Sequence, residues 1–214
     1  MTVAAVVVAG GRGVRFGGLK QFSRVADRSV AAHSVAAARS VAEVVALVVP
    51  PGHEGADEGA DIVVSGGDSR AESVRRGLAA LPACDIVVVH DAARPLASPA
   101  LFAAVVRAVR DGADGAIPGL RVTDTVKRVA TRDDDLVVVG TVDRSDLVTV
   151  QTPQAFRRDV LERAHAGGDD ATDDAALVEM FGGTVVVVAG EADNVKITEP
   201  VDLVRVAAAL EDDQ

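Results

Sequence analysis

The chain has 214 residues, a formal net charge of −10 and 49% hydrophobic residues, which suits one sizeable α/β domain and excludes a disordered chain. The acidic balance, with five Phe and neither Trp nor Tyr, argues against a nucleic-acid partner, so any phosphate should bind in a local pocket. A lone cysteine, Cys84, excludes an internal disulfide. No stretch has the length of a membrane span, and no basic residue precedes the first apolar run, so we expect a cytoplasmic protein with no membrane partner.

Apolar runs and helical patterns then alternate along the chain. Valine-rich runs without polar alternation predict buried strands at residues 3–9, 44–49, 61–64, 86–90, 115–118 and 184–189. Helical patterns predict helices at residues 30–39, 69–81, 98–110, 158–166, 174–181 and 200–210. This alternation predicts the α/β class: a Rossmann-like, mostly parallel sheet with helices on both faces. Ligands of such sheets bind beyond the carboxyl ends of the strands.

Residues 121–152 break this pattern. Two extended runs, at 122–129 and 136–142, flank an acidic turn at 133–135 and predict a β-hairpin. The hairpin has too little apolar surface to form a core of its own, and an isolated hairpin is only marginally stable. We therefore expect a projecting arm that a partner subunit covers.

The first strand ends in a glycine-rich loop at residues 10–20, and this loop carries the strongest chemical signal. Glycines let the backbone approach a phosphate closely, and Arg15 and Lys20 add positive charge. The loop lacks the third glycine of a dinucleotide fingerprint, because Phe16 stands there, and lacks the Gly-Lys-Ser/Thr of a P-loop. Only three of the 22 basic residues are lysines, which suggests that Lys20 and Lys196 are needed as compact ammonium groups.

Three further motifs each allow two interpretations. In residues 90–95, Asp91 could bind Mg²⁺ or a hydroxyl and Arg94 an anion, or the two could form an ordinary surface pair; His90 is expected to be structural. Residues 66–74 could offer free N–H groups to a base or phosphate, or simply begin a capped helix. Asp193 and Lys196 could serve a phosphate and a metal, or form a local ion pair.

Together these motifs resemble the 2-C-methyl-D-erythritol 4-phosphate cytidylyltransferases, along roughly residues 3–210. The matching stretches are residues 11–20, 66–74, 90–95, 124–127, 141–144, 152–154, 172–174 and 193–198. The chain departs from the family at Gly17-Gly18-Leu19, where relatives usually have a longer loop with proline before the lysine. The entry to the loop, Ala9-Gly10-Gly11, also resembles the ribitol-5-phosphate cytidylyltransferases, so that activity stays an alternative. A second alternative is a non-catalytic nucleotide-binding regulator.

The resemblance implies transfer of a cytidylyl group from CTP to a polyol phosphate, with Mg²⁺ as cofactor. It implies that Arg15 and Lys20 stabilise charge on the CTP phosphates, while Arg144 and Lys196 position the acceptor phosphate. The implied lining of the acceptor site is Asp91, Arg94, Thr125 and Thr172, with Asp91 also a candidate metal ligand. The implied nucleotide-binding residues are Gly11, Gly13, Gly67, Asp68 and Ser73.

The resemblance also implies an organisation. Residues 1–214 would form a single nucleotidyltransferase domain, and residues 121–148 would be a dimerisation β-arm. The arm would carry Thr125 and Arg144 into the site of the neighbouring subunit of a homodimer. The acceptor phosphate is itself a nucleophile, so the chemistry needs cations rather than a covalent nucleophile.

Overall fold

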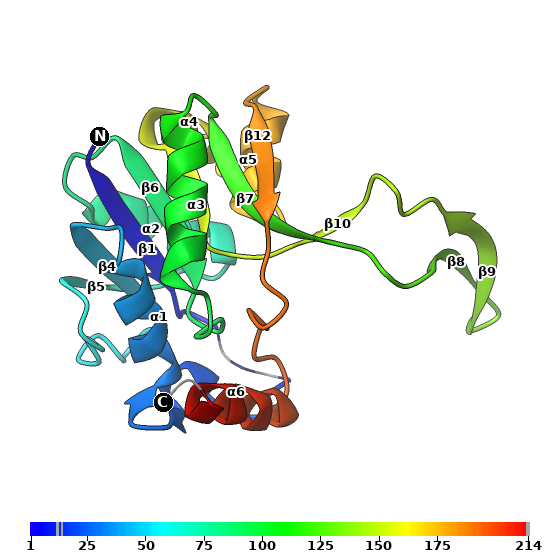
Figure 1. Ribbon diagram of the computed structural model, residues 1–214, viewed down its shortest axis with the longest axis horizontal. Coiled ribbons are helices and arrows are strands. Elements are labelled where there is room, and N and C mark those ends of the chain that lie inside the picture. The colour runs from blue at the N-terminus through cyan, green and yellow to red at the C-terminus, as the bar shows by residue number, and fades with distance from the viewer. Residues whose placement is uncertain (12, 14, 213–214) are drawn as a thin grey trace.

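A computed structural model describes residues 1–11, 13 and 15–212, and within these ranges an eight-stranded sheet forms the centre (Figure 1). The strand order is β10-β7-β11-β6-β1-β4-β5, and β12 also pairs with β7. The strands are β1 (Val3–Val8), β4 (Val44–Val49), β5 (Ile62–Ser65), β6 (Ile86–Asp91), β7 (Gly115–Arg121), β10 (Val148–Val150), β11 (Gln154–Arg157) and β12 (Val185–Ala189). Only β10 and β11 run antiparallel to their neighbours, so the predicted mostly parallel sheet is confirmed.

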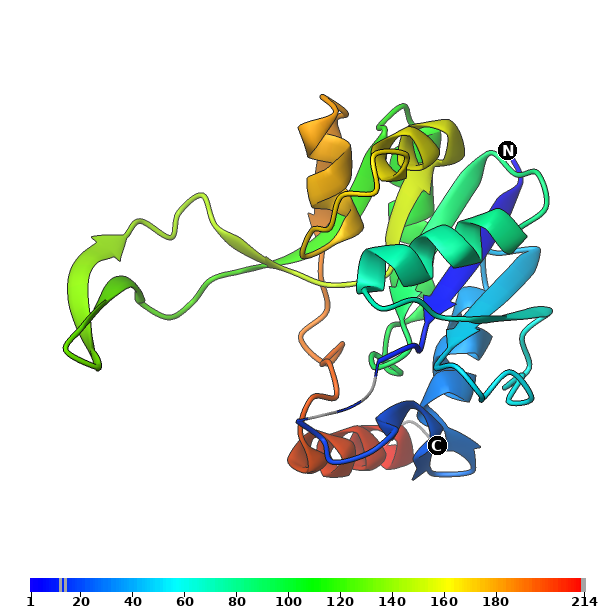
Figure 2. The same cartoon turned by 180° about the vertical axis from the view of Figure 1, so that it is seen from behind.

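Helices cover both faces of this sheet. The helices are α1 (Val30–Ala38), α2 (Arg70–Ala80), α3 (Pro99–Arg110), α4 (Arg158–His165), α5 (Asp174–Met180) and α6 (Pro200–Asp212). One core cluster joins α1 and α3 to one face of the sheet, in front in Figure 1. A second joins α2, α4 and α5 to the other face, which Figure 2 turns toward the viewer.

Strand β1 shows why the apolar runs lack polar alternation. Val3, Ala5 and Val7 belong to the first cluster, whereas Ala4 and Val6 belong to the second. Successive side chains of a strand point to opposite faces, so a strand covered by helices on both sides must be apolar throughout. The six valine-rich runs and six helical patterns all correspond to strands and helices of the structure, with ends shifted by a few residues.

Two strands of the sheet, β10 and β11, were not predicted. They run antiparallel beside β7, and β11 also pairs with β6. Both are short and lie around the polar segment Gln151, Thr152 and Gln154, so neither presents an apolar run. Tertiary packing, rather than local pattern, makes them strands.

A third cluster lies below the sheet. Here α6 packs near the two-stranded β2 (Arg24–Val25) and β3 (Arg28–Ser29), and the buried residues are Val25, Val30, Ile197 and Val206. The 3₁₀ helix η1 (Lys20–Phe22) leads from the glycine loop into this region. The cluster therefore brings the segment before α6 next to the end of the glycine loop.

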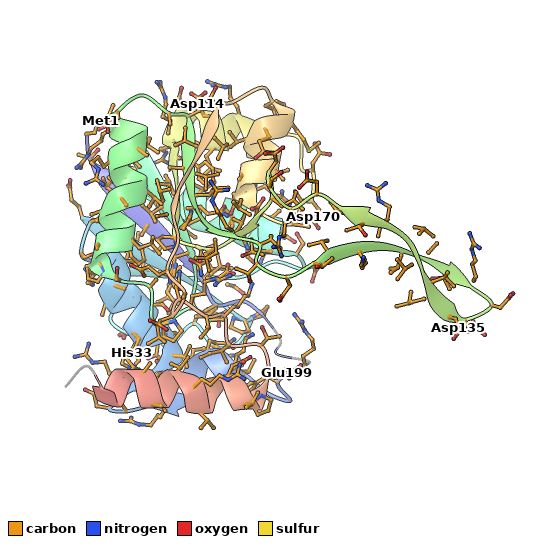
Figure 3. The ribbon with its side chains drawn as sticks, turned by 45° about the vertical axis from the view of Figure 1, so that its right-hand side comes forward. Met1, His33, Asp114, Asp135, Asp170 and Glu199 are labelled. Carbon is orange, nitrogen blue, oxygen red and sulfur yellow. The ribbon has the colours of Figure 1, made fainter. Side chains whose placement is uncertain are left out.

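The predicted hairpin is present and projects from the body of the molecule (Figure 1). Its strands are β8 (Val126–Arg132) and β9 (Asp135–Val142), so the first strand begins four residues later than predicted. The turn residues Asp133 and Asp134 have φ values of 48° and 70°, in the left-handed region that aspartate tolerates. Figure 3 shows the arm with its side chains standing clear of the body and Asp135 near its tip.

None of the helices in the described ranges has the length and apolar content that crossing a membrane would require.

Candidate active site

The glycine loop leaves the carboxyl end of β1 and closes on itself through Gly13. The carbonyl of Gly13 accepts hydrogen bonds from the N–H groups of Phe16, Gly17 and Gly18, at 3.0, 2.9 and 3.3 Å. Gly13 has φ +63°, and a Cβ there would lie 1.8 Å from the Gly18 oxygen, so only glycine fits. The loop residues Arg12 and Val14 lie outside the described residues.

Gln21 holds the base of this loop. Its side chain is buried, and its Nε2 donates to the carbonyls of Ala9 at 2.7 Å and Gly11 at 3.1 Å. Both carbonyls belong to the segment that leaves β1, whereas Gln21 lies in η1 at the far end of the loop. One amide therefore ties the start of the loop to its end, in a chain that lacks the usual proline.

A cavity of about 350 Å³ lies over this loop at the carboxyl ends of β1 and β6. It includes eight of the residues predicted for the site: Gly11, Arg15, Lys20, Gly67, Asp68, Ser73, Asp91 and Lys196. Gly13 is absent from this lining and shapes the loop instead. The structure therefore brings together three motifs from the first half of the chain with Lys196, more than a hundred positions away.

Three cations gather at one side of this cavity. Lys20 donates its ammonium to the carbonyl of Ile197, just after Lys196. Burial, followed by the neighbouring charges of Lys196 and Arg15, holds the pKa of Lys20 below its usual value. Like charges destabilise one another in this position unless an anion is bound. The arrangement therefore suits a polyphosphate.

Gly67 and Ser73 form the opposite wall. The Ser73 hydroxyl accepts from the N–H of Gly67 at 3.1 Å and donates to the carbonyl of Ser69 at 2.9 Å. Ser69 caps α2 by accepting from the N–H of Glu72 at 3.1 Å, and Glu72 accepts from the N–H of Asp68 at 2.8 Å. The cap of α2 and the turn that lines the cavity are therefore one structure, because the hydrogen bonds of Ser69 and Glu72 hold this turn in place.

Asp91 lies at the end of β6 with its side chain only 11% exposed. Its Oδ2 accepts from the Lys196 ammonium at 2.6 Å, and its Oδ1 accepts from Nε of Arg70 at 3.3 Å. Burial alone would raise the pKa of Asp91, but the charges of Arg70 and Lys196 hold it far below its usual range. Of the two interpretations of Asp193 and Lys196, the local ion pair is wrong: the Lys196 ammonium pairs with Asp91 at the end of β6 instead.

The prediction of Asp91 as a metal ligand has little support from its surroundings. Both carboxylate oxygens already contact cations. In the part of the chain that the structure describes, no three acidic, histidine or cysteine side chains come together as metal ligands. Mg²⁺ prefers several oxygen ligands, so these residues do not fit a resident metal ion.

A second cavity of about 300 Å³ adjoins the first. It is lined by the predicted residues Asp91, Arg94, Thr172 and Lys196, together with Arg70, Val150, Gln151, Thr152, Gln154 and Asp173. Asp91, Arg70 and Lys196 line both cavities. Two ligands bound side by side would therefore meet at this charged boundary.

His90 precedes Asp91 in β6 and is fully buried, as expected for a structural residue. The carbonyl of Arg94 lies 3.1 Å from His90 Nε2 and can only accept, so Nε2 carries the proton and donates to it. Nδ1 of the neutral ring then accepts from Thr152 Oγ1 at 3.1 Å, and the same hydroxyl oxygen accepts from the N–H of Asp91 at 3.0 Å. Arg94 in turn donates to the carbonyl of Asn194 at 2.6 Å. The motif of residues 90–95 is thus a hydrogen-bonded turn rather than a surface ion pair.

Thr125 and Arg144 lie elsewhere. Both are exposed near the base of the projecting arm, and neither lines either cavity. Arg144 donates to the carbonyl of Thr123 within the arm. A single chain therefore does not bring these two predicted residues to the site.

Sequence reasoning missed Arg70, Gln21 and Asp174 as members of the site. Arg70 lies within the recognised motif of residues 66–74, and Gln21 directly follows Lys20, so both positions carried a signal. Asp174 follows Thr172 and Asp173 but begins a helix, where an acidic residue is ordinary. Its burial against Arg70 could be seen only in three dimensions.

A doubly wound α/β sheet with a glycine loop and a cation cluster at the carboxyl ends of its strands is typical of proteins that bind nucleotides, the nucleotidyltransferases among them. The chain belongs to the 2-C-methyl-D-erythritol 4-phosphate cytidylyltransferase family, whose model matches residues 3–212.

Individual relatives agree with this assignment. The 2-C-methyl-D-erythritol 4-phosphate cytidylyltransferase of Streptomyces avermitilis is 44% identical, over 97% of this chain and 91% of that protein. A bifunctional enzyme IspD/IspF of Anaeromyxobacter sp. is 48% identical over 98% of this chain, which spans 57% of that relative's length. The crystal structure of the cytidylyltransferase from Thermus thermophilus superposes with a TM-score of 0.82 at 37% identity, covering 98% of both chains.

Gln21→Leu should loosen the glycine loop. The change keeps the volume but leaves the carbonyls of Ala9 and Gly11 without their donor, so we expect the free energy of unfolding to fall by about 2 kcal/mol. Amide hydrogen exchange at Phe16, Gly17 and Gly18 should accelerate. Gln21→Glu is the matched control for shape, and it should destabilise the loop at least as much as leucine, because a carboxylate cannot donate and its charge would face two carbonyl oxygens. Unchanged exchange in both variants would show that Gln21 does not hold the loop.

His90 should make the fold sensitive to mild acid. Burial lowers its pKa to about 4 from 6.5, so the unfolded chain binds more protons between these two values. The free energy of unfolding should therefore decline as pH falls from about 6.5 to 4, by up to about 3 kcal/mol from this residue. Urea titrations across this range would measure it. His90→Gln should flatten the pH dependence, and an unchanged slope in that variant would contradict the assignment.

Proposed function

We propose that this protein transfers the cytidylyl group of CTP to 2-C-methyl-D-erythritol 4-phosphate, forming 4-diphosphocytidyl-2-C-methyl-D-erythritol and releasing pyrophosphate, a step of isoprenoid precursor biosynthesis. The observation that carries the proposal is the pair of adjoining cavities that share Asp91, Arg70 and Lys196. One cavity has the glycine loop and the capped turn of α2 for a nucleotide. The other has Arg94 and Thr172 for a hydroxylated acceptor. Membership of the family supports the same reaction.

The reaction forms one bond and breaks one. An oxygen of the acceptor phosphate attacks the α-phosphorus of CTP, and the bond to the β-phosphate breaks with its electron pair on pyrophosphate. The attacking oxygen is already anionic, so no side chain needs to remove a proton. The chain's contribution is to hold the two phosphates in line and to offset the growing negative charge.

The cations of the first cavity divide this work. Arg15 and Lys20, at the end of the glycine loop, are placed for the triphosphate and its leaving group. Lys196, at the boundary of the cavities, is placed for the acceptor phosphate. A half-buried ammonium stabilises charge more strongly than an exposed one, because water screens it less.

We treat Mg²⁺ as part of the nucleotide substrate. Mg²⁺ is commonly held by one or two carboxylates together with substrate phosphates. The described residues do not form a metal site of their own, which favours entry of the ion as the complex with CTP. A cytoplasmic location accords with both substrates being phosphorylated and highly polar.

We further propose that the protein acts as a homodimer whose arm completes the partner's site. The arm, residues 121–148, exposes a row of apolar side chains: Val129, Leu136, Val138 and Val139, which are 46%, 72%, 58% and 47% exposed. A two-fold partner would cover these on both arms at once. Thr125 and Arg144 would then have a site to act in, because neither residue lines a cavity of its own chain.

Pyrophosphate release with each candidate acceptor tests the proposed function. Purified protein with Mg²⁺ and CTP should release pyrophosphate when 2-C-methyl-D-erythritol 4-phosphate is added. Ribitol 5-phosphate is the matched control, since it is also a polyol phosphate. Turnover with ribitol 5-phosphate alone would identify a ribitol-5-phosphate cytidylyltransferase, and CTP binding without turnover on either acceptor would identify a nucleotide-binding regulator.

Lys20→Ala and Arg15→Ala should each lower kcat by at least about a hundredfold, because each removes a charge that faces the transition state. Lys20→Arg should also lower kcat, since a wide planar guanidinium cannot reproduce the compact charge that Lys20 holds against the Ile197 carbonyl. Arg24→Ala, an exposed cation four residues along that lines neither cavity, is the control. Wild-type turnover in a folded Lys20→Ala variant would remove Lys20 from the mechanism.

Mixed dimers test the shared site. When Arg144→Ala and Lys20→Ala protomers are mixed equally and exchange freely, one site of each heterodimer should contain neither change. Activity should return to about a quarter of the wild-type value, since half of the dimers are mixed and half of their sites intact. Mixing Lys20→Ala with Arg15→Ala should restore nothing, because both changes affect the chain's own loop. Absence of recovery in the first mixture, with subunit exchange demonstrated, would place Arg144 outside the partner's site.

A further inference from the structure

Arg70 joins three elements that are distant in the sequence. It is the first residue of α2, and its side chain reaches both Asp91 at the end of β6 and Asp174 at the start of α5. Nε lies 3.3 Å from Asp91 Oδ1, and Nη1 lies 2.7 Å from Asp174 Oδ2. Nη2 is buried and makes no hydrogen bond within the described part of the chain, so the two carboxylates alone orient the guanidinium.

Asp174 is a fixed anchor for this arginine. The residue has no exposed surface, and its second oxygen, Oδ1, lies 3.0 Å from His165 Nε2. Burial alone would raise the pKa of Asp174, but the hydrogen bond from His165 and the charge of Arg70 keep it below its usual value. Both oxygens are therefore engaged, and the carboxylate stays ionised in an apolar layer formed by α4 and α5.

The other end of Arg70 leads to the site. Asp91 receives Arg70 on one oxygen and Lys196 on the other, and the Lys196 side chain is 43% exposed. His165, Asp174, Arg70, Asp91 and Lys196 thus form one continuous series of contacts from the core to the boundary of the two cavities. Charges alternate in sign along the last four members, so each group holds the next in place.

We propose that Arg70 is a positioning residue for the transfer reaction: anchored by Asp174 and His165, it holds Asp91 and thereby Lys196 where the acceptor phosphate meets the nucleotide. This inference rests on the proposed function for its kinetic consequences, but not for its structural ones. The position requires arginine, because one planar guanidinium contacts two carboxylates from different elements, whereas an ammonium is a single compact charge. A cation whose place is set by such a series is ready before substrate binds.

A double-mutant cycle separates positioning from direct contact. Arg70→Gln should lower kcat/KM for the acceptor by about a hundredfold, as expected when a reacting group is displaced by about 1 Å. In a Lys196→Gln background the same change should cost less than about threefold, because the group that Arg70 positions is already gone. The KM for CTP should change by less than about threefold. Losses that multiply in the double variant would overturn the proposal and show that Arg70 acts independently of Lys196.

Breaking a buried ion pair is strongly destabilising, so Arg70→Gln could unfold the protein. Two milder variants therefore repeat the test. Arg70→Lys keeps the charge but can reach only one carboxylate, and Asp174→Asn keeps the shape but removes the anchoring charge. Each should lower kcat/KM for the acceptor by about tenfold while the thermal midpoint shows a folded protein. Arg75→Gln, on the same helix and outside both cavities, should match wild type. Full activity in both Arg70→Lys and Asp174→Asn would overturn the proposal.

A crystal structure of Arg70→Lys gives a readout that needs no substrate. The Asp91 carboxylate and the Lys196 ammonium should be displaced by about 1 Å or more from their present positions. If both groups keep their positions and their 2.6 Å contact, Arg70 does not position them and the inference fails. Absence of turnover by the wild-type enzyme would instead contradict the proposed function, and the crystal structure would still decide the inference.

Discussion

A buried carboxylate between two cations is the interaction on which the site depends. Asp91 is ionised although it is almost fully buried, and it stays so only because Arg70 and Lys196 contact its two oxygens. An unpaired carboxylate there would be costly to bury. The pairing therefore does two things at once: it lets a charge remain at the end of a central strand, and it places a half-exposed ammonium between two cavities.

The backbone around this carboxylate is organised for the same purpose. Parallel strands end at one edge of the sheet, so β1 delivers the glycine loop beside β6 and its Asp91. The loop closes through Gly13, and Gln21 ties its start to its end. His90, neutral and buried, braces the next turn through Thr152 and Arg94. Function thus rests on hydrogen bonds that keep flexible loops in one conformation.

The arm differs from the rest of the chain because it has no core of its own. It adds no buried residue to the three core clusters and exposes apolar side chains along β9. Such a hairpin is marginal alone, and its exposed edges favour pairing with another chain. It also carries Thr125 and Arg144, which line neither cavity of a single chain. Dimerisation would satisfy the apolar surface and the two polar side chains together.

The sequence by itself determined the architecture and the chemical class. Valine runs alternating with helical patterns predicted the doubly wound sheet, because strands buried on both faces must be apolar throughout. The glycine loop with Arg15 and Lys20, and the order of the motifs, indicated a nucleotidyltransferase, because close phosphate contact demands glycine and cations. The hairpin could be predicted because its two runs flank an acidic turn.

Only the tertiary structure decided which charges pair. One interpretation of the sequence paired Lys196 with Asp193, three residues away, but Lys196 pairs with Asp91, 105 positions distant. Arg70 and Asp174 carried no pattern that distinguishes a buried ion pair from two surface charges. Such pairings depend on which loops the fold brings to one edge of the sheet. Local sequence does not show which residues will meet there. The site was therefore predictable as a set of motifs, whereas its network of contacts was not.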